Sequence, residues 1–194
     1  VTRGRVRPAR GRNAAERRCP VVVRPAVLSD IPDILPMVAA ICALHESWDP
    51  ARYAARGDVV EMYARWLPER AQDPRSVFLV GHERTDRAGV TDADAGPRPG
   101  LLGFLIASVE RAIPIYRVAE FGFVHDLWVE PAARGRGLGE MLARAAIDRF
   151  RRIGVAQVRL ETSLANDGAR RLFERAGFRV ATIDMLLELT PETR

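Results

Sequence analysis

The segment Leu127–Gly139, which reads LWVEPAARGRGLG, constrains the fold of this chain more than any other. An apolar strand stops at Pro131, and a turn with glycines at 135, 137 and 139 then runs directly into a helical pattern. Glycines leave the backbone N–H groups of such a turn uncovered, and the positive end of the helix dipole points the same way. The segment therefore predicts a socket for a diphosphate.

The spacing of the glycines separates this turn from two other phosphate-binding loops. A P-loop requires Lys and Ser or Thr after its last glycine, whereas Glu140 and Met141 follow Gly139. A dinucleotide-binding turn places its third glycine three positions after the second, which this run does not. Dinucleotide binding is therefore only a minor alternative, and no nucleoside triphosphate is indicated.

Apolar periodicity predicts a single α/β domain over residues 21–194. A hairpin followed by alternating strands and helices indicates a mixed sheet flanked by helices. Pro36 is expected to bend or interrupt the first helix. Residues 84–100, rich in Asp, Gly and Pro, predict a mobile loop. The expected strands are 21–24, 76–82, 101–109, 121–129, 155–162 and 183–189, and the expected helices are 31–42, 51–67, 138–154 and 166–177.

The positive charge is concentrated at one end of the chain. All 30 basic residues are arginine, and residues 1–20 hold seven of them against Glu16 alone. Because this segment lacks apolar periodicity and aromatic residues, we expect a disordered Arg-rich arm, with an RNA or membrane tether as the alternative. A nucleic acid partner is not expected.

Composition argues against several further classes. No stretch approaches the roughly 20 apolar residues that a membrane span needs, so we expect no membrane association and a cytoplasmic location. Cys19 and Cys42 lack metal-ligand spacing, and neither a disulfide nor a metal is expected.

The chain combines an L-x-V-x-P strand, the turn Arg134-x-x-Gly137-x-Gly139 and, further along, Asn166, Ala169 and Gly177-Phe178. This combination resembles the GNAT superfamily of N-acetyltransferases. The resemblance covers about residues 21–190 and is densest over 123–178. It implies a mixed, mostly antiparallel sheet with a central V-shaped splay, the acyl-CoA N-acyltransferase fold. The strands that would splay apart are the one ending at Val129 and the one starting at Val155. Two closing strands are common in the family, and the second is expected to be missing or completed differently.

The resemblance implies acetyl-CoA as the acyl donor, held mostly by main chain, and no metal. Pantetheine would pair with the backbone of Leu127 and Val129, and the turn would take the pyrophosphate. Which of Arg134 and Arg136 faces the phosphates stays open, and Asn166 either contacts the cofactor or caps its helix. The expected cofactor-binding residues are Leu127, Trp128, Val129, Arg134, Gly135, Arg136, Gly137, Leu138, Gly139, Asn166 and Phe173.

Two residues are expected to act in catalysis. The backbone N–H of Val129 would, by analogy, donate to the thioester carbonyl oxygen as it gains charge. His125 is the first candidate for the base, because it alternates with Leu127 and Val129 and its ordinary pKa is near 6.5. A partly buried histidine bonded to backbone is the alternative. Asp126 would face the opposite side unless a β-bulge re-aims it. The reserve candidates are Glu161, Glu120, His45 and Glu46.

The implied activity is direct transfer of an acetyl group to a primary amine of a small molecule that is polyamine-, amino acid- or aminoglycoside-like. A protein amine is the nearest alternative acceptor, and a homodimer is left open. Many family members have a tyrosine that protonates the departing thiolate at the position of Phe173, so the general acid is unassigned. That departure motivates a second alternative, an acetyl-CoA-binding regulator with weak catalysis. A closed acidic pocket lined by Glu46, Glu120 or Asp126 would favour a cationic small molecule, and an open groove would favour a peptide terminus.

Overall fold

The computed structural model describes residues 20–84 and 100–189 of the chain. The Arg-rich arm and the segment expected to be a mobile loop lie outside these residues, except for Pro20, Arg84 and Gly100, so both expectations stay predictions. The elements, in order, are β1 (Val21–Pro25), η1 (Leu28–Asp30), α1 (Ile31–Trp48), α2 (Pro50–Tyr53), α3 (Val59–Gln72), β2 (Ser76–Glu83), β3 (Leu101–Arg111), β4 (Glu120–Val129), η2 (Pro131–Ala133), α4 (Leu138–Ile153), β5 (Val158–Leu160) and α5 (Asp167–Arg175).

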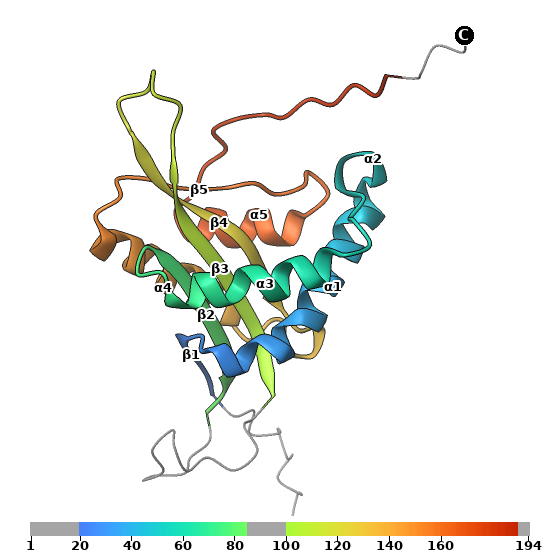
Figure 1. Ribbon diagram of the computed structural model, residues 1–194, viewed down its shortest axis with the longest axis vertical. Helices are drawn as coiled ribbons and strands as arrows, with labels where there is room; N and C mark the ends of the chain where they lie inside the picture. The colour runs from blue at the N-terminus through green and yellow to red at the C-terminus, as the bar shows by residue number, and fades with distance from the viewer. Residues whose placement is uncertain (1–19, 85–99, 190–194) are drawn as a thin grey trace, which may run out of the picture.

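The five strands form one sheet in the order β1-β2-β3-β4-β5. The first three pairings are antiparallel, and only β4 and β5 run parallel. Helices flank this sheet (Figure 1). The expected mixed, mostly antiparallel α/β architecture is confirmed.

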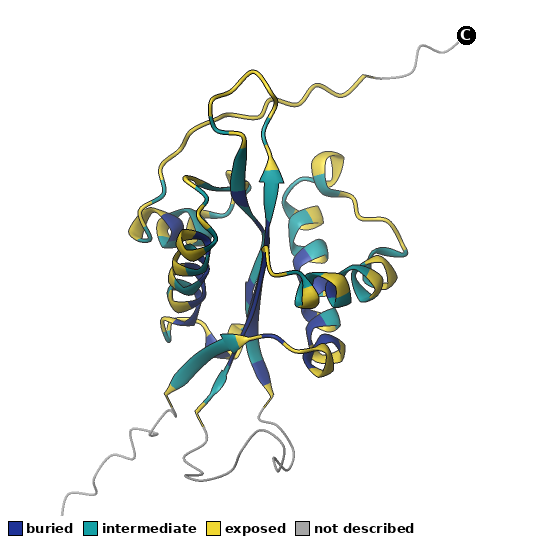
Figure 2. Cartoon of the chain, turned by 60° about the vertical axis from the view of Figure 1, so that its left-hand side comes forward, coloured by how far each residue is buried: buried dark blue, intermediate teal, exposed yellow. Residues whose placement is uncertain are grey.

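Helices cover both faces of the sheet, and Figure 2 shows them on either side of strands seen nearly edge-on. The alternation of side chains along β3 divides the core between the two faces. Phe104 and Ile106 pack with α1 and α3, whereas Leu105 and Ala107 pack with α4. The end of β4 between these layers is therefore reached by side chains of α1 and α3 from one side and of α4 from the other.

Helix α1 is the most apolar helix of the described chain. It continues through Pro36 without interruption, so of the two effects expected of this proline, a bend or a break, the break is absent. By length and composition alone, the segment Leu28–Trp48 is long and apolar enough to cross a membrane, which differs from the expectation that no segment reaches that length. Its buried side chains, which include Ile34 and Val38, pack against the sheet.

The sequence prediction fails most clearly after α5. Residues 183–189 were expected to form the last strand, but the segment that follows α5 is in no strand as far as Leu189. The apolar side chains of Ile183, Met185, Leu187 and Leu189 are all exposed. A strand forms only against a neighbour, and within the single chain this segment leads away from the sheet toward the labelled end of the chain (Figure 1).

Two smaller differences concern element boundaries. The expected helix 51–67 is split into α2 and α3 by a break that contains Gly57. The strand expected over 155–162 pairs only over Val158–Leu160. Because β5 pairs with β4 over only three residues, a cleft opens beyond the end of this pairing.

Candidate functional site

A cleft opens where β4 and β5 part. The two strands pair only as Gly122 with Val158, Phe123 with Arg159 and Val124 with Leu160. From Asp126 onward β4 has β3 on one side and no β5 residue on the other. A cavity of about 680 Å³ occupies this opening. Its lining residues include Ile41, Leu44, His45 and Trp48 of α1, Val124–Val129 of β4, Arg134, Gly135, Gly137, Leu138 and Gly139 of the turn, Leu160–Thr162, and Asn166, Ala169, Leu172 and Phe173.

The glycine turn forms one end of the cleft. Gly135 and Gly137 have φ of +74° and +81°, in the left-handed region that glycine adopts without strain. Gly139 has another role, because a Cβ there would lie 2.7 Å from Cδ1 of Leu172 in α5. Two glycines therefore shape the turn, and the third lets α4 approach α5.

The N-terminus of α4 is open toward a ligand. Its N-cap is Gly137, which has no side chain to accept from the first-turn N–H groups. A Cβ placed on Gly135 or Gly137 would meet no atom within 4 Å, so the space above the turn is open. Uncapped N–H groups at the positive end of a 16-residue helix fit a phosphate.

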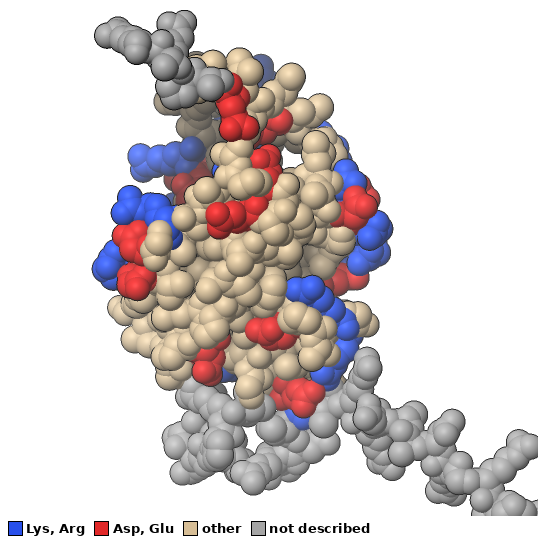
Figure 3. Space-filling view, turned by 90° about the vertical axis from the view of Figure 1, so that its right-hand side faces the viewer, with Lys and Arg blue, Asp and Glu red and all other residues tan. Residues whose placement is uncertain are grey.

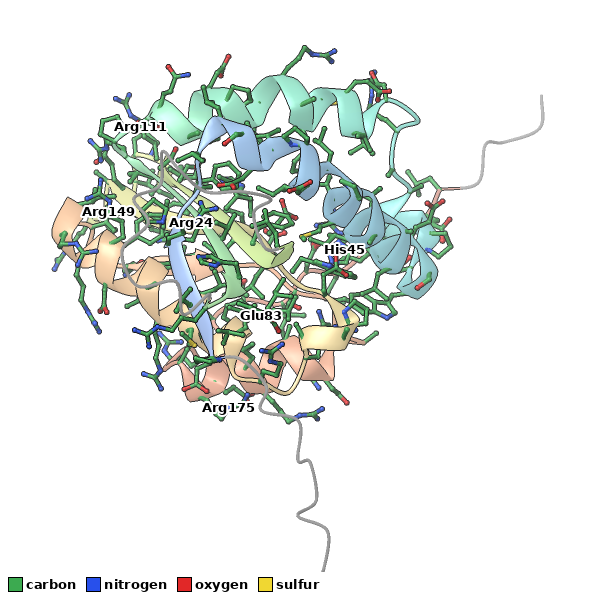
Figure 4. All side chains as sticks on the ribbon, turned by 90° about the horizontal axis from the view of Figure 1, so that it is seen from below. Arg24, His45, Glu83, Arg111, Arg149 and Arg175 are labelled. Carbon is green, nitrogen blue, oxygen red and sulfur yellow. The ribbon has the colours of Figure 1, made fainter. Side chains whose placement is uncertain are left out.

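The two arginines of the turn have different surroundings. Arg134 lines the cleft; its Nε donates to the carbonyl oxygen of Val129 at 3.0 Å, and its guanidinium lies 4.9 Å from the ring centre of Trp128. Arg136 instead donates from Nη1 to Oε1 of Glu83 at 2.9 Å. Glu83, at the end of β2, is labelled in Figure 4. Of the two side chains, that of Arg134 is the one at the cleft.

Helix α5 supplies the opposite wall of the cleft. Oδ1 of Asn166 accepts a hydrogen bond from the Ala169 N–H at 3.0 Å, so this side chain caps the helix, which was one of its two expected roles. Phe173 is buried and its ring centre lies 5.4 Å from that of Phe178. Both Asn166 and Phe173 line the cleft.

A β-bulge in β4 determines which side chains face α3. Ile106 pairs with Asp126 and Ala107 pairs with Val124, so His125 is the extra residue of the bulge. The His125 ring lies edge-on to Trp66 of α3 at 5.2 Å, and Oδ2 of Asp126 accepts from the Tyr63 hydroxyl, also on α3, at 2.7 Å. Two consecutive residues of β4 thus face the same helix.

The bulge corrects the expected side of His125. Strict alternation would place it with Leu127 and Val129, but those two side chains pack in the α4 layer. The bulge moves His125 to the α3 side, where Asp126 and Trp128 also lie. From the sequence, a bulge was allowed for only as a way to reorient Asp126. A bulge is present, but the side chain that it reorients is that of the neighbouring His125.

A short hydrogen-bonded chain holds the His125 ring. Nε2 lies 2.6 Å from Oγ of Ser108, and that hydroxyl donates to Oε1 of Glu110 at 2.7 Å. Because a hydroxyl has one hydrogen, Ser108 accepts from the Nε2–H, which leaves the lone pair of the neutral ring on Nδ1. Burial lowers the pKa of His125, the Glu110 carboxylate partly opposes this, and Arg70 lowers the pKa further. The ring is therefore neutral near pH 7.

Asp126 is a carboxylate enclosed between β4, α1 and α3. Burial raises its pKa, and the hydrogen bond from Tyr63 acts in the opposite direction. Burial and the neighbouring Asp126 raise the pKa of Tyr63 in turn, and they also raise the pKa of the Cys42 thiol. A buried carboxylate with few hydrogen-bond donors gains from a cation that enters beside it.

The reserve candidates separate into two groups. His45, labelled in Figure 4, lines the cleft with its ring 5.4 Å from Trp48 and 5.2 Å from Tyr53, and burial lowers its pKa. Glu161 also lines the cleft but is mostly exposed. Glu46 is exposed and does not line the cleft. Glu120 pairs with Arg75 at the start of β4, the end of the strand away from the cleft.

Sequence reasoning missed Ser108, Tyr63, Trp66 and Trp48. The first three reach the site only through the register of β3 with the bulged β4 and the packing of α3, so no local pattern marks them. Trp48, near His45 at the end of α1, could have been found as an aromatic beside a titratable side chain. Among the described residues, no group of three or more His, Cys, Asp or Glu side chains could hold a metal ion.

The surface beside α1 and α2 has a mixed charge. Figure 3 shows carboxylates near the middle of the upper half of this face and most arginines toward its margins. Much of the remaining surface in this view is uncharged. This face therefore presents no continuous basic patch.

Comparisons with known proteins agree with this geometry. Residues 41–178 match the acetyltransferase (GNAT) family. The chain is 31% identical over 140 residues to a mycothiol acetyltransferase of Mycobacteroides abscessus, a match that covers 71% of this chain and 40% of that protein. The chain thus spans less than half the length of this relative.

Solved structures show the same fold at low sequence identity. A mutant protein from Bacillus halodurans superposes with a TM-score of 0.69 at 17% identity, covering 87% of this chain and 99% of that one. The aminoglycoside 6'-N-acetyltransferase of Acinetobacter baumannii superposes with a TM-score of 0.60 at 13% identity, covering 88% and 98%. These likenesses concern the arrangement of helices and strands.

Proposed function

The chain belongs to the acetyltransferase (GNAT) family, and from that membership we propose that it transfers an acetyl group from acetyl-CoA to a primary amine of a small molecule. The observation that carries the proposal is the cleft between β4 and β5, with the glycine turn at one end and His125 and Asp126 of the β4 bulge among its lining residues. The turn that is suited to bind phosphate and the titratable residues His125 and Asp126 therefore line the same cavity.

The residues of the turn fit the coenzyme. The N–H groups from Gly135 to Gly139 and the Arg134 guanidinium would hold its pyrophosphate, since nothing fills the space above the two left-handed glycines. The unpaired edge of β4 at Leu127 and Val129 offers backbone groups to the pantetheine amides, as an added strand would. Acetyl-CoA supplies the activated thioester carbonyl, and the Val129 N–H would donate to its oxygen.

His125 is proposed as the base that takes a proton from the substrate ammonium, so that the neutral amine can attack the thioester carbonyl carbon and displace the coenzyme A thiolate. Ser108 orients the ring through Nε2, and the lowered pKa keeps Nδ1 unprotonated at neutral pH. Asp126 is the alternative base, because this residue also lines the cleft and carries a carboxyl group. With phenylalanine at 173, no side chain there donates to the departing thiolate, which would take its proton from solvent.

The acceptor proposed is a cationic small molecule. Of the three carboxylates considered for an acidic acceptor pocket, only Asp126 lines the cleft, where burial leaves it in need of a counter-charge. The ring of Trp48, which also lines the cleft, adds an aromatic face that attracts an ammonium. The names of the similar proteins, which include an aminoglycoside acetyltransferase, support a small-molecule acceptor.

The test is thiol release from acetyl-CoA with a panel of amines that contains polyamines, amino acids, aminoglycosides and peptides with free N-termini. We expect release above the no-amine background with one of the small-molecule classes. Release with peptides alone would favour a protein amine as acceptor. Coenzyme A binding by calorimetry without release for any amine would favour the regulator, and no binding at all would remove both functions.

A further inference from the structure

A second cavity, of about 650 Å³, shares no lining residue with the cleft. It lies beside the start of β2, where β1 has already ended. β1 pairs with β2 only from Leu79 to Glu83, so no residue of β1 pairs with Ser76, Val77 or Phe78. The walls come from the end of β1, the last turn of α3 with the turn that follows it, the start of β2 and the second half of α4. A cavity of this size holds a small organic molecule.

Part of the lining is apolar. Val23 of β1 and Val77 and Leu79 of β2 line this cavity, and all three belong to the apolar layer that packs with α4. Ala145 of α4 also lines the cavity and packs with the same layer. Apolar walls that carry a few polar groups are typical of sites for small organic ligands.

The charged part of the lining on α4 is mainly arginine. Arg149 and Arg152 are three positions apart, so they lie on the same side of the helix. Nη2 of the half-buried Arg149 donates to the carbonyl oxygen of Pro74 at 3.1 Å, whereas Arg152 is exposed. Among the described residues, no carboxylate oxygen lies within 4.0 Å of either guanidinium. Two positive charges of the lining therefore have no ion-pair partner there.

Two other charged residues of the lining already have partners of opposite charge. Nη1 and Nη2 of Arg24 donate to the two carboxylate oxygens of Asp30 at 2.6 and 2.8 Å. Asp148 accepts from Nη1 of Arg151 at 2.7 Å. Figure 4 shows Arg24 and Arg149 on the same side of the molecule. Because each of these pairs is neutral overall, neither offsets the charge of Arg149 and Arg152.

Arg70, at the end of α3, contributes a donor without an acceptor. Its Nη1 lies 3.5 Å from Oδ2 of Asp73, and the same oxygen accepts from the Ser76 hydroxyl at 2.8 Å. The Nε of Arg70 is buried and has no hydrogen-bond partner among the described residues. Leaving a buried donor unpaired is unfavourable, so an anion that binds beside Arg70 would gain from it.

From these observations we propose that this cavity, the arginine pocket, binds a small organic molecule that carries a phosphomonoester group. Arg149 and Arg152 each carry one positive charge, and a phosphomonoester carries about −1.5 to −2 near pH 7, with three acceptor oxygens. The planar guanidinium group matches two such oxygens at once. The organic body of the ligand lies against Val77 and Leu79. Because the arginine pocket and the cleft have no lining residue in common, the proposal does not rest on acetyl transfer.

The test is a titration of the full chain with glycerol 3-phosphate, followed by ¹H–¹⁵N NMR, with glycerol as the uncharged control. We expect saturable shifts of backbone amides in residues 70–79 and 145–152 with glycerol 3-phosphate and none with glycerol. Amides of residues 135–139 report separately on any phosphate that binds at the glycine turn. Shifts confined to residues 135–139 would overturn the proposal, and so would the lack of a saturable shift up to about 10 mM ligand.

Three variants identify the groups that bind. Arg152→Gln removes an exposed guanidinium without an ion-pair partner in the described chain, so the fold should tolerate it. It should raise the dissociation constant for glycerol 3-phosphate by about tenfold or more, the effect of losing one charge-assisted hydrogen bond. Arg149→Gln should act in the same direction. An unchanged dissociation constant in both variants would overturn the proposal.

Arg111→Gln is the matched control for Arg152→Gln. Arg111, at the end of β3 and labelled in Figure 4, is also exposed, but it does not line the arginine pocket. Its loss lowers the net charge of the chain by the same amount and should leave the dissociation constant unchanged. Equal weakening by Arg111→Gln and Arg152→Gln would attribute the effect to net charge alone and would overturn the proposal.

Discussion

Gly137 and Gly154 adopt nearly the same left-handed conformation at opposite ends of α4, with φ of +81° and +91°. A side chain in this region costs about 1–2 kcal/mol, whatever space surrounds it. The two positions therefore separate the strain of a substitution from its effect on the cleft, because Gly137 lines the cleft and Gly154 does not.

We expect Gly137→Ala and Gly154→Ala each to lower the free energy of unfolding by about 1–2 kcal/mol. Only Gly137→Ala should also raise the KM for acetyl-CoA, by about tenfold or more, since it redirects N–H groups at the helix terminus. Urea denaturation and steady-state kinetics measure the two effects. Equal KM values in the two variants would show that the turn does not hold the coenzyme.

His125 makes a second prediction at the scale of single residues. His125→Gln should lower kcat/KM by roughly 10²–10⁴, as for loss of a general base. The wild-type rate should fall as pH drops through the His125 pKa, which burial holds below its ordinary value, and the variant should lack this acid limb. Glu110→Gln is the control: it removes the carboxylate that opposes the effect of burial, so the acid limb should move to lower pH. An acid limb that persists in His125→Gln would assign the base to another group, with Asp126 the next candidate.

At the scale of elements, β3 and β4 approach each other closely at Gly103. A Cβ there would overlap the backbone oxygen of Trp128, which cannot move without disturbing the pairing of the two strands. Gly103→Ala should lower the free energy of unfolding by about 1–3 kcal/mol, as overpacking does. Gly57→Ala is the matched control, since a Cβ at Gly57 meets no atom within 4 Å. Thermal denaturation of both variants checks this, and similar midpoints would contradict the close approach.

The elements that the sequence predicted correctly are those whose cause is local. Glycines at 135, 137 and 139 dictate a turn and a helix start within one segment, and Asn166 caps α5 within three residues. The side on which His125 lies is different, because a bulge arises from the register of β4 against β3 and alternation within one strand does not reveal it. In the same way, Arg136 has a partner 53 residues earlier, Glu83, that no spacing rule indicates.

The segment after α5 shows the same limit at a larger scale. Its alternating pattern between Ile183 and Leu189 is typical of a strand, but a strand also needs an edge to pair with. In the single chain the edge of β5 stays open and the segment stays exposed. The pattern therefore indicates that the segment prefers a strand conformation, but it does not indicate which strand the segment would pair with.

At the scale of the whole molecule, the site affects the stability of the fold through protonation. Burial lowers the pKa of His125 and of His45, so the unfolded chain binds more protons than the folded chain below about pH 6.5. Stability from these histidines is present above that pH and is lost as pH falls through their folded values. Asp126 acts in the opposite direction: its raised pKa means that stability is lost as pH rises above its ordinary value of 3.8.

These opposite signs give a prediction that a pair of variants tests. In urea denaturation at several pH values, His125→Gln should reduce the loss of unfolding free energy between about pH 6.5 and 5, because one of the two histidines whose pKa burial lowers is gone. Asp126→Asn should gain stability relative to wild type, and the gain should grow as pH rises, because the asparagine oxygen still accepts from Tyr63 while the cost of ionising a buried carboxylate disappears. Glu161→Gln, in the same cleft but with a side chain 76% exposed, should show no such gain. A gain in Asp126→Asn that is equal at pH 4 and pH 8 would mean that the pKa of Asp126 is not raised in the folded chain, and the need for a cationic acceptor beside it would lose its physical basis.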